Sequence, residues 1–85
     1  MPRMSLNIEM PINKLKDKLN VKEAEIRAAY REYKDTVPPS KRRSMIPYSE
    51  FKRRFLERKV ENILRVVAGN DVAICVNIKE VPEND

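Results

Sequence analysis

Lysine and arginine side chains form the densest group of potentially functional residues in this sequence. Between residues 41 and 59 the chain carries eight of them, and only Glu50 and Glu57 oppose them within that segment. Flexible cations of this kind bind phosphate groups, which positions a protein on a nucleic acid without reading its base sequence. Tyr48, within the same segment, could add stacking on an unpaired base. The segment therefore predicts a surface that binds a polyanion.

A second basic set lies on a segment with helical periodicity, over about residues 22–34. Its apolar residues, from Ile26 to Tyr33, follow the spacing i, i+3, i+4 and i+7, which places them on one stripe of a helix. The opposite face of that helix is basic. Over both sets, the candidate nucleic-acid-binding residues are Lys22, Arg27, Arg31, Lys34, Lys41, Arg42, Arg43, Lys52, Arg53, Arg54 and Arg58.

Size and composition are those of one small domain. The chain has 85 residues, of which 41% are hydrophobic and 36% charged, and this balance argues against full disorder. The formal net charge is +5, with a pI near 9.6. A small basic domain often binds a polyanion, but a net charge of this size equally serves solubility. Net charge alone therefore leaves both interpretations open.

The residue types that are missing exclude several kinds of chemistry. Histidine, the commonest general base and metal ligand, is absent, so we expect neither an enzyme nor a metal or cofactor site. A single cysteine, Cys75, cannot form a disulfide within the chain and fits a reducing compartment, which predicts a cytoplasmic protein. The apolar runs are too short for a transmembrane helix, and the first residues do not resemble a secretory signal, so no membrane partner is expected.

The hydrophobic pattern predicts an α+β domain in the order β-α-α-α-β. Residues 4–10 and 72–81 alternate between polar and apolar, as half-buried strands do, and the terminal strands are expected to form a small ribbon. Three prolines predict a basic loop without regular structure between the second and third helices. The expected segments are a strand over 4–10, helices over 12–19, 22–34 and 49–68, the loop over 35–47, a strand over 72–81 and a frayed tail over 82–85.

The third and longest predicted helix is the main source of the core. Ser49 is a plausible N-cap, Gly69 lies just past the C-terminus, and Asn20 is placed to end the first helix in a left-handed conformation. One broad apolar face is expected to bury its residues, which are Phe55, Leu56, Val60, Ile63, Leu64 and Val67.

Two strands in so short a chain leave their edges exposed. The strands could pair with each other, or the N-terminal strand could pair with its copy in a second chain. Leu6 and Ile8 have few apolar partners within a chain of this length. We therefore expect a homodimer that pairs through residues 4–10.

The spacing of apolar residues around Asn20 resembles a helix-turn-helix DNA-binding motif over residues 13–34. Leucine stands before the turn at Leu15 and Leu19, valine after it at Val21, and Ala24 and Ile26 follow in the second helix. The resemblance implies that the second helix enters a nucleic-acid groove, with DNA favoured over RNA. It also implies that Arg27 contacts bases and Lys22 contacts phosphate, as in a transcription regulator.

Two other interpretations remain open. Residues 12–34 could be an ordinary helix hairpin packed on the third helix, whose arginines would pair with Glu57 and Glu61 in a solvated face. The basic helix and loop could instead bind an acidic protein, which would make the chain an inhibitor or adaptor of a larger machine. The sequence favours a small non-enzymatic nucleic-acid-binding regulator, with the protein-interaction module as the alternative.

Overall fold

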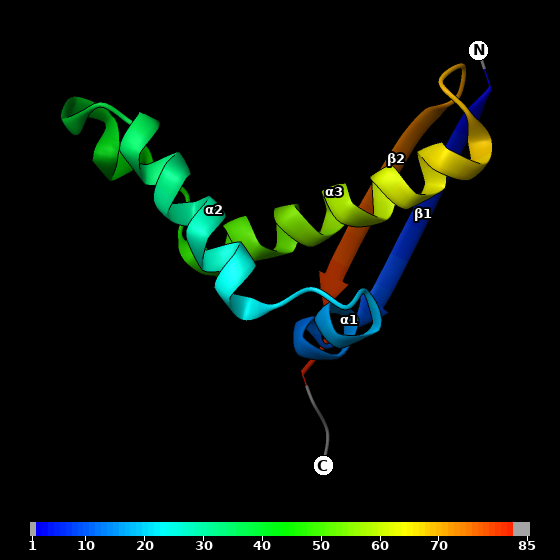
Figure 1. The fold of residues 1–85 in the computed structure, drawn as a ribbon, viewed down its shortest axis with the longest axis horizontal. Coiled ribbons are helices and arrows are strands. Elements are labelled where there is room, and N and C mark those ends of the chain that lie inside the picture. Colours follow the sequence, from blue (N-terminus) through cyan, green and yellow to red (C-terminus); the bar gives the residue numbers. More distant parts are fainter. Residues whose placement is uncertain (1, 83–85) are drawn as a thin grey trace.

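Two terminal strands and three intervening α-helices make up the fold, as the sequence predicts (Figure 1). The computed structural model describes residues 2–82. The chain is therefore an α+β domain with one added 3₁₀ helix. In order, the elements are β1 (Arg3–Met10), α1 (Ile12–Lys18), α2 (Glu23–Thr36), the 3₁₀ helix η1 (Pro39–Ser44), α3 (Tyr48–Ala68) and β2 (Ala73–Glu80).

The two strands pair with each other in parallel. Their register runs without a bulge from Arg3 opposite Ala73 to Met10 opposite Glu80. Parallel neighbours need a long crossover connection, and here the connection contains all of the helices. The ribbon expected from the sequence thus forms within one chain.

Both strands direct alternate side chains towards the helices, which confirms the predicted periodicity. In β2 the inward Val76 and Ile78 are buried, whereas Cys75 and Asn77 between them are exposed. In β1 the even-numbered residues from Met4 to Met10 face the same side and are half-buried. The opposite face of the sheet carries polar, charged or small side chains, and no helix of the described part of the chain covers it.

The core lies between the sheet and α3. Ile26 of α2 and Leu56 of α3 have no exposed surface, and α3 packs along β2. The buried apolar residues are Ile12, Leu15, Val21, Ile26, Leu56, Val60, Val76 and Ile78.

The prediction that one broad apolar face of α3 is buried is only partly correct. Leu56 and Val60 are buried and Phe55 and Leu64 pack against them. The expectation is wrong for Ile63 and Val67, which are 53% and 84% exposed. A sheet of two strands is too narrow to cover a broad helical face, so only the stripe that points at β2 becomes buried.

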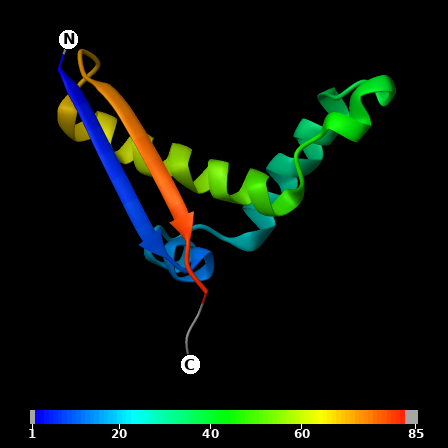
Figure 2. The same ribbon diagram turned by 180° about the vertical axis from the view of Figure 1, so that it is seen from behind.

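α2, η1 and the first half of α3 project away from the sheet as an arm, which gives the molecule the shape of a V (Figures 1 and 2). The molecule measures 40 × 39 × 19 Å. Neighbouring aromatic rings hold α2 against α3, with ring centroids 5.1–6.4 Å apart, in the geometries that aromatic pairs favour. The residues of this aromatic cluster are Tyr30, Tyr33, Tyr48, Phe51 and Phe55.

The ends of the elements confirm two sequence predictions and correct two others. Asn20 and Gly69 have φ angles of 57° and 89°, the left-handed conformation expected at helix ends. Residues 35–47 do not lack regular structure, because α2 continues to Thr36 and η1 begins at Pro39, where a missing N–H costs no hydrogen bond.

Ser49 is not the N-cap of α3, since α3 already begins at Tyr48 after Pro47. Residues 83–85 of the expected tail lie outside the described residues.

Replacing Leu56 with alanine should destabilise the fold far more than truncation of an exposed apolar side chain of α3. Removal of a fully buried leucine side chain leaves a cavity, so Leu56→Ala should lower the free energy of unfolding by about 2–5 kcal/mol. Val66→Ala is the matched control, because Val66 is 88% exposed, and its effect should stay within about 0.5 kcal/mol. Urea denaturation followed by circular dichroism measures both; equal effects would contradict the described core.

Candidate nucleic-acid interface

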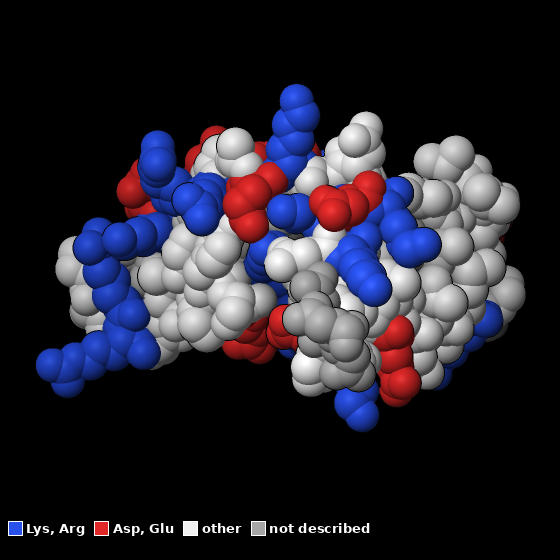
Figure 3. Space-filling model, turned by 90° about the horizontal axis from the view of Figure 1, so that it is seen from below, with Lys and Arg blue, Asp and Glu red and all other residues white. Residues whose placement is uncertain are grey.

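The far end of the arm carries a group of exposed cations. Five side chains from the end of α2 and from η1 are exposed there, and none forms an ion pair within residues 2–82. Lys and Arg side chains project from this end of the molecule in Figure 3, at its left-hand side. Glu32 and Asp35 are the acidic residues of the same segment, so positive charge remains in excess. We call the five residues the basic tip: Arg31, Lys34, Lys41, Arg42 and Arg43.

A hydrogen bond from α2 fixes the segment that returns from the basic tip to α3. The Tyr30 hydroxyl donates to the Ile46 carbonyl oxygen at 3.0 Å. Tyr30 also packs edge-on against Phe51 at 5.1 Å between ring centroids. The sequence predicts Tyr30 only as part of the buried stripe of α2. In the structure it also determines where the chain after η1 runs, and so where the tip lies.

Three of the predicted contact residues of α3 have partners within the chain. Lys52 Nζ lies 2.8 Å from Glu23 Oε1, and the guanidinium groups of Arg53 and Arg54 lie 3.4 and 3.1 Å from the carboxylates of Glu57 and Glu50. The sequence left open a solvated helix face whose arginines pair with Glu57 and Glu61. Of those pairs, Arg65 with Glu61 at 3.7 Å forms as expected, whereas Arg54 pairs with Glu50 instead. An external phosphate would have to compete with the carboxylates for Lys52, Arg53 and Arg54, unlike the cations of the basic tip.

The remaining predicted residues, Lys22, Arg27 and Arg58, are exposed and lie outside both groups. Arg58 borders a shallow groove of about 310 Å³ between α2 and α3, together with Arg54. Tyr33 and Phe51 line the same groove, with their rings stacked at 5.5 Å. The sequence does not predict this groove, because its walls come from two helices that only tertiary packing brings together.

The residues that carry the helix-turn-helix resemblance differ in their burial. Leu15, Val21 and Ile26 are buried, whereas Ala24, which the resemblance would bury, is exposed. At the start of α2, Glu25 Oε1 lies 3.0 Å from Lys59 Nζ of α3. The acidic side chains in the first turn of α2 therefore point towards α3. The basic residues further along α2 remain exposed.

Glu23 is the centre of a polar cluster that joins all three α-helices. It pairs with Lys52 of α3, and Lys16 Nζ of α1 lies 3.7 Å from the same oxygen, Oε1. The Tyr48 hydroxyl donates a hydrogen bond to its other oxygen. The hydrogen bond from Lys52 is the largest cause that lowers the pKa of Glu23 to about 2, followed by the bond from Tyr48.

Tyr48 is therefore not free to stack on a base, contrary to the expectation from the sequence. Its hydroxyl is bound to Glu23, and its ring packs edge-on against Tyr30 at 5.3 Å. Burial is the first cause that raises the pKa of Tyr48, and the hydrogen bond to Glu23 is the second. The residue stabilises the junction of α2 with α3.

Comparisons with known proteins identify no relative. No family model matches the chain, and no significant match is found among curated proteins or solved structures. Within residues 2–82 no group of three or more His, Cys, Asp or Glu side chains is arranged to hold a metal ion. No helix in the described part of the chain is long and apolar enough to cross a membrane.

The ion pairs of Glu23 should make the stability of the protein depend on pH in acid. Because the pKa of the folded state, about 2, lies below the ordinary value of 4.5, the stabilisation is complete above pH 4.5 and is lost as the pH falls towards 2. The side chain is 33% exposed, so solvent screening reduces the contribution to roughly 1–2 kcal/mol.

Glu23→Gln isolates this contribution, since the other carboxyl groups titrate in both proteins. The free energy of unfolding, measured by urea denaturation between pH 6 and 2, should fall more steeply for the unmodified protein than for Glu23→Gln. Parallel curves for the two proteins would show that Glu23 has an ordinary pKa and that the cluster does not stabilise the fold.

Proposed function

We propose that the chain is a small, non-enzymatic nucleic-acid-binding protein that binds phosphate groups through its basic tip, with DNA favoured over RNA. The observation that carries this proposal is that the predicted contact residues differ in whether carboxylates of the chain pair with them. Lys52, Arg53 and Arg54 on α3 are neutralised by nearby carboxylates, whereas the cations of the basic tip have no such partners among residues 2–82. Unpaired cations bind phosphates without first losing an ion pair, and they release condensed counterions when they do so.

The exposed face of α2 extends this surface from the basic tip towards the sheet. Arg27, Arg31 and Lys34 follow i, i+4 and i+7 and are all exposed, so they lie on one stripe along the arm. A single helix fits the major groove of DNA, and the resemblance to a helix-turn-helix assigns that role to α2. In this arrangement η1 would contact the phosphates beside the groove while α2 contacts bases.

The single cysteine, Cys75, fits a role in a reducing compartment. Cys75 is exposed on the face of the sheet opposite the helices. An exposed thiol is best kept in its reduced form, so we propose that the protein acts in the cytoplasm.

The salt dependence of DNA binding should distinguish the two groups of cations. Arg42→Ala/Arg43→Ala should reduce the slope of log K against log [salt] by about 1–2 units, because each neutralised phosphate contributes about 0.9. Arg53→Ala/Arg54→Ala removes the same charge from residues that are paired within the chain, and it should change the slope by less than about 0.5. Fluorescence anisotropy with a labelled DNA duplex measures both. A larger loss in the α3 variant would contradict the proposal.

Absence of binding at low salt, to both duplex DNA and RNA, would reject nucleic acid as the partner. The same basic tip would then favour the alternative function, an inhibitor or adaptor that binds an acidic protein. Binding that is lost steeply with added salt supports the proposal, because neutralised phosphates make affinity depend on ionic strength.

Arg27 should affect sequence preference rather than general affinity. If α2 contacts bases, Arg27→Ala should weaken binding to a selected site by roughly 1–3 kcal/mol and leave binding to unrelated duplexes nearly unchanged. Arg31→Ala is the matched control, because Arg31 lies on the same stripe but belongs to the basic tip, and it should weaken binding to all duplexes alike. Selection from a random DNA library, followed by competition assays, makes the comparison. An equal loss on every sequence would limit Arg27 to a phosphate contact.

A further inference from the structure

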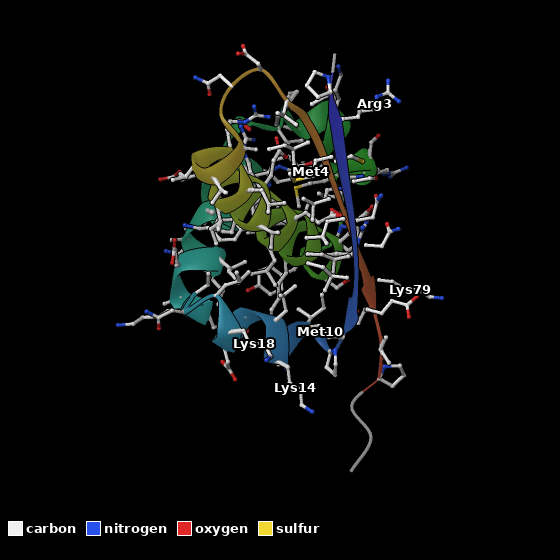
Figure 4. The ribbon with its side chains drawn as sticks, turned by 90° about the vertical axis from the view of Figure 1, so that its right-hand side faces the viewer. Arg3, Met4, Met10, Lys14, Lys18 and Lys79 are labelled. Atoms are coloured by element: carbon white, nitrogen blue, oxygen red, sulfur yellow. The ribbon has the colours of Figure 1, made fainter. Side chains whose placement is uncertain are left out.

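The outer edge of β1 is open to another strand. Pro2 and Met10 accept hydrogen bonds from β2 and the residue after it through their carbonyl oxygens. Since a strand in a parallel pair bonds its neighbour through alternate residues, the backbone groups of the odd-numbered residues point to the opposite edge. These residues are Arg3, Ser5, Asn7 and Glu9. Figure 4 looks onto this edge, and no other element covers β1 in that view.

The edge of β2 is protected, in contrast to that of β1. Glu57 of α3 accepts a hydrogen bond from the backbone N–H of Ile78 at 3.1 Å, and Arg65 donates to the Val72 carbonyl oxygen at 3.3 Å. Side chains of α3 thus satisfy two of the backbone groups at the outer edge of β2. This favours extension of the sheet at β1.

The two strands also differ in how deeply their inward-facing side chains are buried. Val76 and Ile78 of β2 are buried beneath α3, but their neighbours in register, Leu6 and Ile8, are only half-buried. Met4 and Met10 also point to the helix side of the sheet, as Figure 4 shows. This apolar strip would be covered further by a partner whose own strand and helices continue the same layer.

The charges of β1 are complementary to those of a second copy in the antiparallel direction. Arg3 and Glu9 lie on the outer face, three residues on either side of Leu6. A twofold axis at Leu6 therefore places Arg3 opposite Glu9 of the other copy, twice, and Ser5 opposite Asn7. Within one chain Glu9 is already beside Lys79, so each carboxylate would lie between two cations.

From the open edge, the half-buried strip and this charge pattern we infer that two copies of the chain dimerise through antiparallel pairing of β1 with β1, which gives a four-stranded sheet. The exposed area of the chain is large enough for such an interface. The chain exposes 6644 Å², whereas a monomer of 10.0 kDa exposes about 5,200 Å². The excess exceeds the area of about 800 Å² that each partner contributes to a standard interface.

A charge exchange across the twofold axis tests the interface and its register. Arg3→Glu puts like charges opposite each other at both pairs, and Glu9→Arg does the same with the opposite sign. Each variant alone should dimerise roughly tenfold or more weakly than the unmodified protein. An equimolar mixture should recover the dimer, because one chain then carries carboxylates at both positions and the chain opposite it carries guanidinium groups at both. Sedimentation velocity over a range of concentrations measures the association.

Circular dichroism and a different surface provide the controls. Thermal unfolding of each dilute variant shows whether the monomer still folds, particularly for Glu9→Arg, which places two cations side by side within the chain. Val66→Lys alters the exposed apolar side of α3 and should leave the dimer intact. A monomer at all concentrations for the unmodified protein, no recovery on mixing, or dissociation by Val66→Lys alone would each overturn the proposed interface.

Discussion

The carboxylate of Glu23 joins the three α-helices, and the position of the arm depends on it. Its partners are Lys16 of α1 and Tyr48 and Lys52 of α3, while Glu23 itself begins α2. α1 and α2 both pack against α3, which is the helix that lies along β2. A polar cluster at that junction therefore connects the sheet layer to the arm. The aromatic cluster completes the junction on the apolar side, between α2 and α3.

The same cluster contributes to the separation of charge that carries the proposed function. Glu23 neutralises Lys52, and Glu50 and Glu57 neutralise the two arginines that follow it. These carboxylates are located on α2 and α3, whereas η1 contains no acidic residue. The cations at the end of the arm farthest from the sheet therefore have no ion-pair partner among residues 2–82. Fold and proposed function are linked through the placement of a few acidic side chains.

The sequence predicted those parts of the fold that depend on neighbouring residues, namely the strands and the conformations at the helix ends. Alternation identified both strands, and the left-handed conformations of Asn20 and Gly69 followed from their residue types and positions. Parallel pairing could not be predicted, because the same alternation serves parallel and antiparallel neighbours. The exposure of Val67 was missed for a related reason, since it depends on the width of the sheet beneath α3.

The candidate site also combines features that the sequence predicts with features that depend on the tertiary structure. The number of cations and the stripe on α2 can be read from the sequence, as can the i, i+4 pairs of Arg53 and Arg54. The pair between Lys52 and Glu23 joins residues 29 apart and requires the helices to be packed. Sequence periodicity therefore identified the basic residues, and tertiary structure decided which of them remain available.

Mapping of a bound duplex by NMR tests the central claim most directly, namely that the basic tip is the nucleic-acid interface. A short DNA duplex titrated at low salt into the isotopically labelled protein should shift the backbone amide signals of residues 31–44 most strongly. The outer residues of the sheet, such as Cys75, should not shift. Shifts concentrated on residues 50–57 of α3, or no shifts at all, would contradict the account.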